Sequence, residues 1–158
     1  TGETFETTVD VDVDAYIPAG YIPNEAQKLD VYKRIAGIET EDEREEMLEE
    51  LIDRFTEPPK PVLNLLDLAW YRAMAHRYYF TEVAQKGNEV RFVLFEHAKI
   101  DPVKIPDFVA AYQGKLKFYA DKKIPQFIYQ MNRNSRQKDN VMEVIADVLS
   151  QAEQIQEM

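Results

Sequence analysis

Apolar and polar residues alternate with a period of two from Thr7 to Ala15, the pattern of a half-buried β-strand. The aspartates at every second position resemble the opening of a calcium-binding loop. The sixth and twelfth positions of such a loop hold Ala15 and Tyr21, where glycine and glutamate are needed. We therefore expect a strand here rather than a metal site.

A helical period follows, with three apolar stripes in succession. Asn24 is expected to cap the first helix and Gly37 to end it. Thr40 and Glu43 form a capping box for a second helix that ends at Phe55, and a third begins near Pro61. The core residues expected on the first helix are Ala26, Leu29, Val31, Tyr32 and Ile35.

The second half of the chain changes to short β-strands. Strands are expected over 79–85 and 89–96, joined as a hairpin, and over 116–120 and 126–131, with a short helix over 106–113 between the pairs. A last helix runs from Val141 to Ile155 with one continuous apolar face. These elements predict an α+β fold: a helical amino-terminal half packed with short antiparallel strands and a closing carboxy-terminal helix.

Composition places the chain in the ordinary globular class, with 158 residues, 45% hydrophobic and 30% charged. We expect a single domain over residues 1–158, with residues 1–8 as a linker, cut from a longer multidomain chain because it begins at Thr1. The absence of cysteine excludes disulfides and cysteine-type zinc sites and fits a reducing cytoplasm. No apolar run is long enough for a membrane span.

Charge is unevenly distributed along the chain, whose net charge is −10. Residues 1–60 hold 17 acidic and 6 basic side chains, whereas residues 61–158 hold 12 and 13. This balance argues against a nucleic-acid-binding surface over the whole domain. An acidic half is consistent with a basic partner, and it is also consistent with a charge that only keeps the domain in solution.

Motifs for enzymatic chemistry are missing from the sequence. The five glycines stand too far apart for a phosphate-binding loop, and neither His76 nor His97 has a second ligand at helical spacing. We therefore expect no catalytic residue, cofactor or metal, and no nucleotide binding. A small hydrolase with an unrecognised carboxylate site remains an alternative, because carboxylates are abundant.

Basic residues gather between Lys115 and Lys138, close to aromatic residues that could stack on single-stranded nucleic acid. Strands with lysines on the wet face and aromatic residues on the dry face produce the same pattern. A nucleic-acid-binding accessory domain is therefore a second alternative. The residues concerned are Lys115, Lys117, Lys122, Lys123, Arg133, Arg136 and Lys138, with Phe118, Tyr119, Phe127 and Tyr129.

The helix expected over 40–55 carries an acidic band opposite its apolar stripe, made of Glu43, Glu46, Glu50 and Asp53. Like charges four residues apart destabilise a helix slightly, and Asp53 near the carboxyl end opposes the helix dipole. Such a band is either a solvated surface or a binding surface. Its side chains are expected to be exposed charges, so their reversal would leave folding nearly intact.

Several segments resemble one protein family: residues 15–23 (AYIPAGYIP), 29–36 (LDVYKRIA), 50–55 (ELIDRF) and 61–66 (PVLNLL). They are similar to the carboxy-terminal domain of the bacterial transcription-repair coupling factors, Mfd. The resemblance is dense over residues 9–75 and looser beyond. Thr56 departs from the pattern, because the family usually has glycine after the Arg-Phe pair.

The resemblance implies a function that composition does not show. Members of this family are ATP-driven DNA translocases that displace stalled RNA polymerase and recruit the excision-repair protein UvrA through an amino-terminal module. The carboxy-terminal domain is not the motor, and in the resting protein it docks on that module and hides the recruitment surface. By this resemblance Glu50 and Asp53 meet arginines of the module, and Glu46 supports them.

Overall fold

The computed structural model describes residues 4–121, 123–132 and 139–158. The chain divides into two compact units, Asp12–Met74 and the combination of Thr1–Val11 with Ala75–Met158. We call the first the helical unit and the second the sheet unit. Together their helices and five-stranded sheet confirm the α+β class, while a single domain with a linker at 1–8 stays a prediction.

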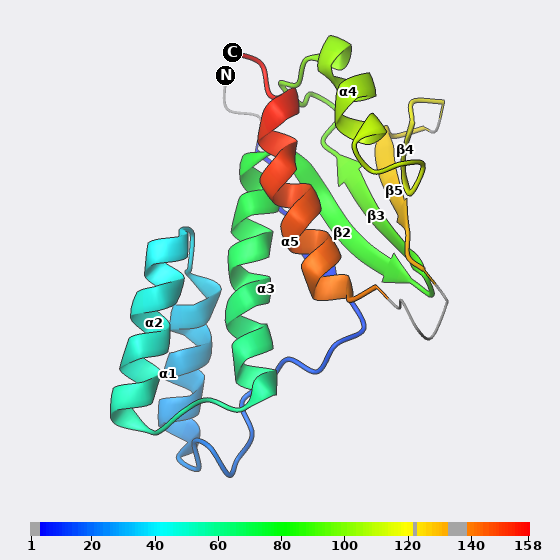
Figure 1. The fold of residues 1–158 in the computed structure, drawn as a ribbon. Coiled ribbons are helices and arrows are strands. Elements are labelled where there is room, and N and C mark those ends of the chain that lie inside the picture. The colour runs from blue at the N-terminus through cyan, green and yellow to red at the C-terminus, as the bar shows by residue number, and fades with distance from the viewer. Residues whose placement is uncertain (1–3, 122, 133–138) are drawn as a thin grey trace. The chain divides into compact units, whose positions relative to one another are not determined.

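The helical unit contains α1 (Glu25–Ala36), α2 (Glu41–Arg54) and most of α3 (Lys60–Arg77). Both predicted caps are confirmed: the Asn24 side chain accepts a hydrogen bond from the Gln27 backbone N–H at 2.9 Å, and Thr40 accepts one from Glu43 at 3.1 Å. Helices α1 and α2 run side by side (Figure 1).

The core of the helical unit is mainly aliphatic, and it confirms only part of the predicted α1 stripe. Val31 and Ile35 are buried, but Leu29 is 58% exposed and Ala26 is also exposed. Successive helical residues are turned by about 100°, so Leu29 points almost opposite to Val31. The buried residues are Ile17, Ile22, Val31, Ile35, Ile38, Met47, Leu51, Val62 and Leu66.

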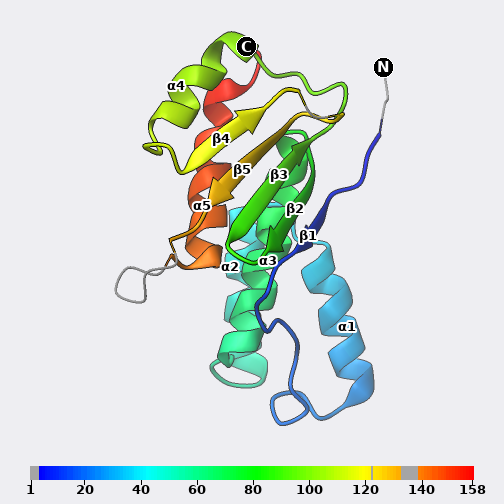
Figure 2. The same ribbon diagram turned by 90° about the vertical axis from the view of Figure 1, so that its right-hand side faces the viewer.

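The sheet unit is built on one mixed sheet in the order β1-β2-β3-β5-β4 (Figure 2). The pairs β2–β3, β3–β5 and β5–β4 are antiparallel, whereas β1 pairs in parallel with β2. Gly87, with φ +62°, makes the tight turn of the predicted hairpin. The strands are β1 (Thr8–Asp10), β2 (Phe80–Lys86), β3 (Glu89–Leu94), β4 (Leu116–Tyr119) and β5 (Gln126–Gln130).

The first strand is shorter than the alternation at 7–15 predicts. Only Thr8–Asp10 pair with β2, although side-chain exposure continues to alternate as far as Ala15. Pairing needs a neighbouring backbone as well as an alternating sequence. After Val11 the chain passes into the helical unit and leaves its partner strand.

Helices complete the sheet unit. A 3₁₀ turn (Pro102–Lys104) leads into the short α4 (Ile105–Ala110), and α5 (Val141–Gln151) continues as a second 3₁₀ turn (Ala152–Ile155). Helix α5 covers one face of the sheet (Figures 1 and 2). Its predicted apolar face is confirmed, because these residues are buried: Val141, Val144, Ile145, Val148, Leu149, Ala152 and Ile155.

Candidate functional site

Helix α2 is anchored to the helical unit by two kinds of contact. Met47 and Leu51 enter the core, with Leu51 completely buried. On the α3 side, Arg44 donates from Nε to the carboxylate of Asp67 at 2.6 Å, and its Nη2 lies at the same distance from that oxygen. These contacts fix which surface of α2 remains outside.

The acidic face, which we define as Glu43, Glu46, Glu50 and Asp53, is less uniform than the sequence predicts. In the helical period Glu50 is turned about 100° from buried Leu51, and Asp53 is turned about 60° further. Accordingly the Glu50 side chain is half-buried, at 32% exposure, whereas Glu46 and Asp53 are exposed. Glu50 therefore lies at the edge of the acidic face that is nearest to α1, where it pairs with Arg34.

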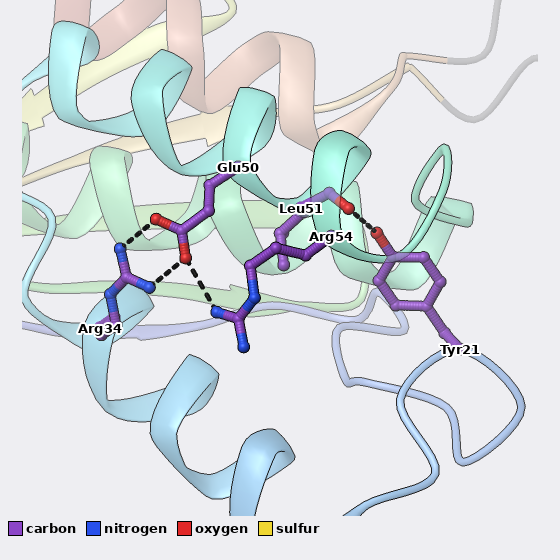
Figure 3. A network of polar contacts seen from close by, with 5 residues as sticks. All are labelled: Tyr21, Arg34, Glu50, Leu51 and Arg54. Carbon is purple, nitrogen blue, oxygen red and sulfur yellow. Dashed lines mark hydrogen bonds and ion pairs between the residues drawn. The ribbon is translucent and has the colours of Figure 1, made fainter.

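Glu50 is the centre of a three-residue ion-pair network (Figure 3). Arg34 of α1 donates from Nη1 to Oε2 and from Nη2 to Oε1 of Glu50, the latter at 2.6 Å. Arg54, one turn further along α2, donates to Oε2 at 2.9 Å. The expectation that Glu50 is a free surface charge is therefore wrong, because this carboxylate links two helices.

The network changes the acidity of Glu50. Hydrogen bonds first from Arg34 and then from Arg54 stabilise the carboxylate and lower its pKa from 4.5 to about 2, against a smaller opposing effect of burial. The same hydrogen bond raises the pKa of the Arg34 guanidinium. At neutral pH Glu50 is fully ionised, and two cations already neutralise it.

A shallow groove of about 230 Å³ lies between α1 and α2. Three carboxylates of the acidic face border it, with the Arg34 guanidinium among them. Apolar side chains at its base suit the methylene stem of a long basic residue. Its lining residues are Arg34, Gly37, Ile38, Glu43, Glu46, Met47 and Glu50.

Glu46 and Asp53 differ from Glu50 in having no ion-pair partner among the residues that the structure describes. Both are exposed, and in the helical period they are turned from Glu50 by about 40° and 60° in the same sense, further away from buried Leu51. An external cation therefore reaches these two carboxylates without displacing another residue.

The carboxyl end of α2 is closed by Tyr21, which lies outside the helix in sequence. Its hydroxyl donates to the backbone oxygen of Thr56 at 2.7 Å. It also lies 3.3 Å from the backbone oxygen of Leu51, the contact drawn in Figure 3. Burial, with the nearby charge of Glu57, raises the pKa of Tyr21. The helix ends at Arg54 although position 56 is threonine, because the backbone N–H of the cap residue Phe55 donates to the Leu51 carbonyl, and Tyr21 adds a contact from outside the helix.

Sequence reasoning found the acidic carboxylates but missed the residues that hold them. Arg54 stands four residues after Glu50, a spacing that favours an ion pair, so the sequence contained this signal. Arg34 is sixteen residues away on another helix, and only the packing of α1 against α2 brings it to Glu50.

Among the residues that the structure describes, two of the four aromatic residues of the basic cluster are not available to stack on nucleic acid. Phe127 and Tyr129 are buried, and Phe118 packs on Phe127 with ring centroids 4.8 Å apart. Lys115 is engaged with Asp139 at 3.1 Å. The predicted positions Lys122, Arg133, Arg136 and Lys138 lie outside the described residues.

His76, for which the sequence shows no second ligand at helical spacing, lies beside Thr7. The Thr7 hydroxyl donates to the Phe80 carbonyl at 2.6 Å, so at 3.1 Å from His76 Nδ1 it accepts the ring proton. Within the described part of the chain, no group of three or more histidine, aspartate or glutamate residues is arranged to hold a metal ion. No described helix is long and apolar enough to cross a membrane.

Comparisons with known proteins agree with the fold. Residues 11–105 match the model of the TRCF domain family. The transcription-repair-coupling factor of Bacillus subtilis (strain 168) is 38% identical over 99 residues, and that of Staphylococcus aureus (strain USA300) is 39% identical over 86. These matches cover 63% and 54% of this chain, but only 8% and 7% of those proteins.

A solved structure extends the likeness to the whole fold. The crystal structure of a C-terminal domain of transcription-repair coupling factor superposes with a TM-score of 0.75 at 23% identity, covering 95% of this chain and 91% of that one. At this identity the superposition shows the fold, and the sequence match to more than half of the chain shows the family. The chain belongs to the TRCF domain family and is a domain of the transcription-repair coupling factor.

Proposed function

We propose that this domain is an autoinhibitory protein-binding module that docks, through the acidic face of α2, on the UvrA-recruiting amino-terminal module of the same full-length protein. Glu46, Glu50 and Asp53 are its charged contacts, and arginines of the module are their partners. While docked, the domain hides the surface that recruits UvrA. Through the full-length protein it is linked to UvrA, RNA polymerase and DNA, and it contributes binding rather than catalysis.

The observation that carries this proposal is the pairing state of the acidic face. Glu46 and Asp53 are exposed on a helix whose opposite side is fixed in the core by Met47 and Leu51. Eight of the fourteen residues of α2 are acidic. A rigid surface of one charge is complementary to a basic partner and sets both the speed and the specificity of docking.

Docking and release follow from the geometry of this surface. Glu46 and Asp53 offer carboxylate oxygens that accept charge-assisted hydrogen bonds from guanidinium groups. Because both lie on the exterior of one helix, a single partner surface reaches them without rearranging the core. Any step that separates the two modules exposes these charges to water, which solvates them well, so release leaves no buried charge behind.

The proposal is tested by reversing the two unpaired charges, Glu46→Lys with Asp53→Lys, in the full-length protein. Lysines facing arginines would oppose docking, so the recruitment surface would be open more often. We expect UvrA to bind the variant at least tenfold more tightly than the unmodified protein, in the absence of ATP and DNA. Glu50 is left unchanged, because its reversal would also break the contact with Arg34.

A matched control carries the same change of charge in the sheet unit, Glu82→Lys with Asp107→Lys, at exposed positions. This control is expected to change UvrA affinity less than twofold. If the reversal on α2 folds normally and UvrA affinity stays at the level of the control, the acidic face is only solvated surface and the proposed docking is wrong.

A further inference from the structure

Arg34 already makes with Glu50 the contact that docking would require of a partner. Its guanidinium takes both carboxylate oxygens, the two-pronged geometry by which arginine recognises carboxylates most strongly. It also borders the groove between α1 and α2 that Glu46 and Glu50 border. A partner arginine directed at Glu50 would therefore find both carboxylate oxygens already bound by Arg34.

We infer that Arg34 is an intramolecular competitor of the partner's arginine. In the undocked domain it occupies Glu50, and a partner guanidinium gains Glu50 only by displacing it. The inference rests on the proposed docking function and adds a residue that sets its strength. Docking through Glu46 and Asp53 needs no such displacement.

The structure permits this exchange without opening the core. The side chains of Arg34 and Arg54 are 42% and 37% exposed, so either can turn into water while its helix stays packed. Arg54 contacts only Oε2 of Glu50, so it leaves Oε1 to another donor, whereas Arg34 holds both oxygens. Arg34 is therefore the residue whose removal frees a complete carboxylate edge.

Competition weakens docking in a calculable way. The apparent affinity of a site is its intrinsic affinity reduced by the fraction of molecules in which the site is free. The apparent affinity of every partner that binds Glu50 is lowered in this way. A lysine supplies one point charge and cannot replace both bonds, so the displacement favours a partner that presents arginine.

The decisive variant is Arg34→Gln in the full-length protein, with UvrA binding measured in the absence of ATP and DNA. Freeing Glu50 would strengthen docking, hide the recruitment surface more of the time and weaken UvrA binding by about three- to tenfold. If Arg34 instead only positions α2, its loss would loosen docking and UvrA would bind more tightly. The two roles thus predict opposite signs.

Lys33→Gln is the matched control, because it removes the same charge from the neighbouring exposed position of α1. It is expected to change UvrA affinity less than twofold. In a protein that also carries Glu50→Gln, the effect of Arg34→Gln should disappear, since there is no carboxylate left to compete for. An undiminished effect in that background would overturn the inference.

Arg34→Lys provides a second route if the glutamine variant folds poorly. It keeps the charge but not the two-pronged contact, so it should weaken UvrA binding in the same direction and by less. Equal or tighter UvrA binding would reject competition. If reversal of Glu46 and Asp53 increases UvrA affinity while Arg34→Gln has no effect, only this inference fails; if neither changes it, the proposed docking fails as well.

Discussion

The interior of the sheet unit contains a cluster of packed aromatic rings, whereas the interior of the helical unit is mainly aliphatic and its rim is charged. Phe80 and Phe108 both pack edge-on against Phe127, with centroids 6.2 and 5.4 Å away. In the helical unit, Arg34 and Arg44 instead join neighbouring helices through carboxylates. The charge differs too: fifteen acidic and seven basic residues in the helical unit, against fourteen and twelve in the sheet unit.

This difference has a functional consequence. In the sheet unit the rings of Phe80, Phe108 and Phe127 are buried and unavailable to a partner. In the helical unit Glu50 both ties α1 to α2 and belongs to the face that we propose for docking. Stability and binding are therefore coupled at this carboxylate, and substitutions there change both, as expected where a functional surface is built from interhelical contacts.

The largest effect should come from the aromatic core, through Phe127→Ala. Phe127 is completely buried between Phe80, Phe108 and Phe118, so its truncation leaves a cavity and should lower the free energy of unfolding by about 3 to 5 kcal/mol. Denaturant unfolding of the chain measures this. A loss below about 1 kcal/mol would mean that the packing of these rings contributes little to the stability of the sheet unit.

A smaller loss is expected from Asp67→Asn in the helical unit. The neutral amide cannot balance Arg44, whose side chain is 18% exposed, and we expect a loss of about 1 to 2 kcal/mol. Asp53→Asn, at an exposed carboxylate of α2, serves as the control and should cost less than about 0.5 kcal/mol. Equal effects in denaturant unfolding would contradict the importance of the charged rim.

The substitution Tyr21→Phe removes the hydroxyl and keeps the ring, so it tests the contribution of the hydroxyl alone. The ring keeps its contact with Phe55, at 5.8 Å between centroids, but the hydrogen bond to Thr56 is lost. We expect a loss of about 1 kcal/mol and faster amide exchange confined to the last turn of α2. Unchanged exchange at that turn would show that it closes without the tyrosine.

The smallest effect concerns the pH dependence of Glu50. Its pKa is lowered to about 2 in the folded protein, so its contribution to stability is complete above its ordinary value of 4.5 and is lost as pH falls toward 2. Since the side chain is 32% exposed, solvent screening limits the contribution to about 1 kcal/mol. The gap in unfolding free energy between the unmodified chain and Glu50→Gln should therefore narrow steadily between pH 5 and pH 3. A constant gap would contradict the network.

Several elements could be predicted from the sequence because their signals are local. The caps at Asn24 and Thr40 depend on residues three positions away, and the face of α5 depends on a repeat within one helix. Two sequence predictions were wrong, one for the length of the first strand and one for the core face of α1. The alternation up to Ala15 pairs only as far as Asp10, and Leu29 was assigned to a stripe that the helical period does not allow.

The sequence by itself determined the α+β class, the order of the helices and strands, the acidic character of α2 and the family resemblance. Only the tertiary structure decided which carboxylates of α2 are free. Exposure and pairing depend on side chains that are distant in the chain, as Arg34 is from Glu50 and Tyr21 from Thr56. A periodic pattern predicts which residues share a face of a helix. The charged residues that contact that face depend on how one helix packs against another.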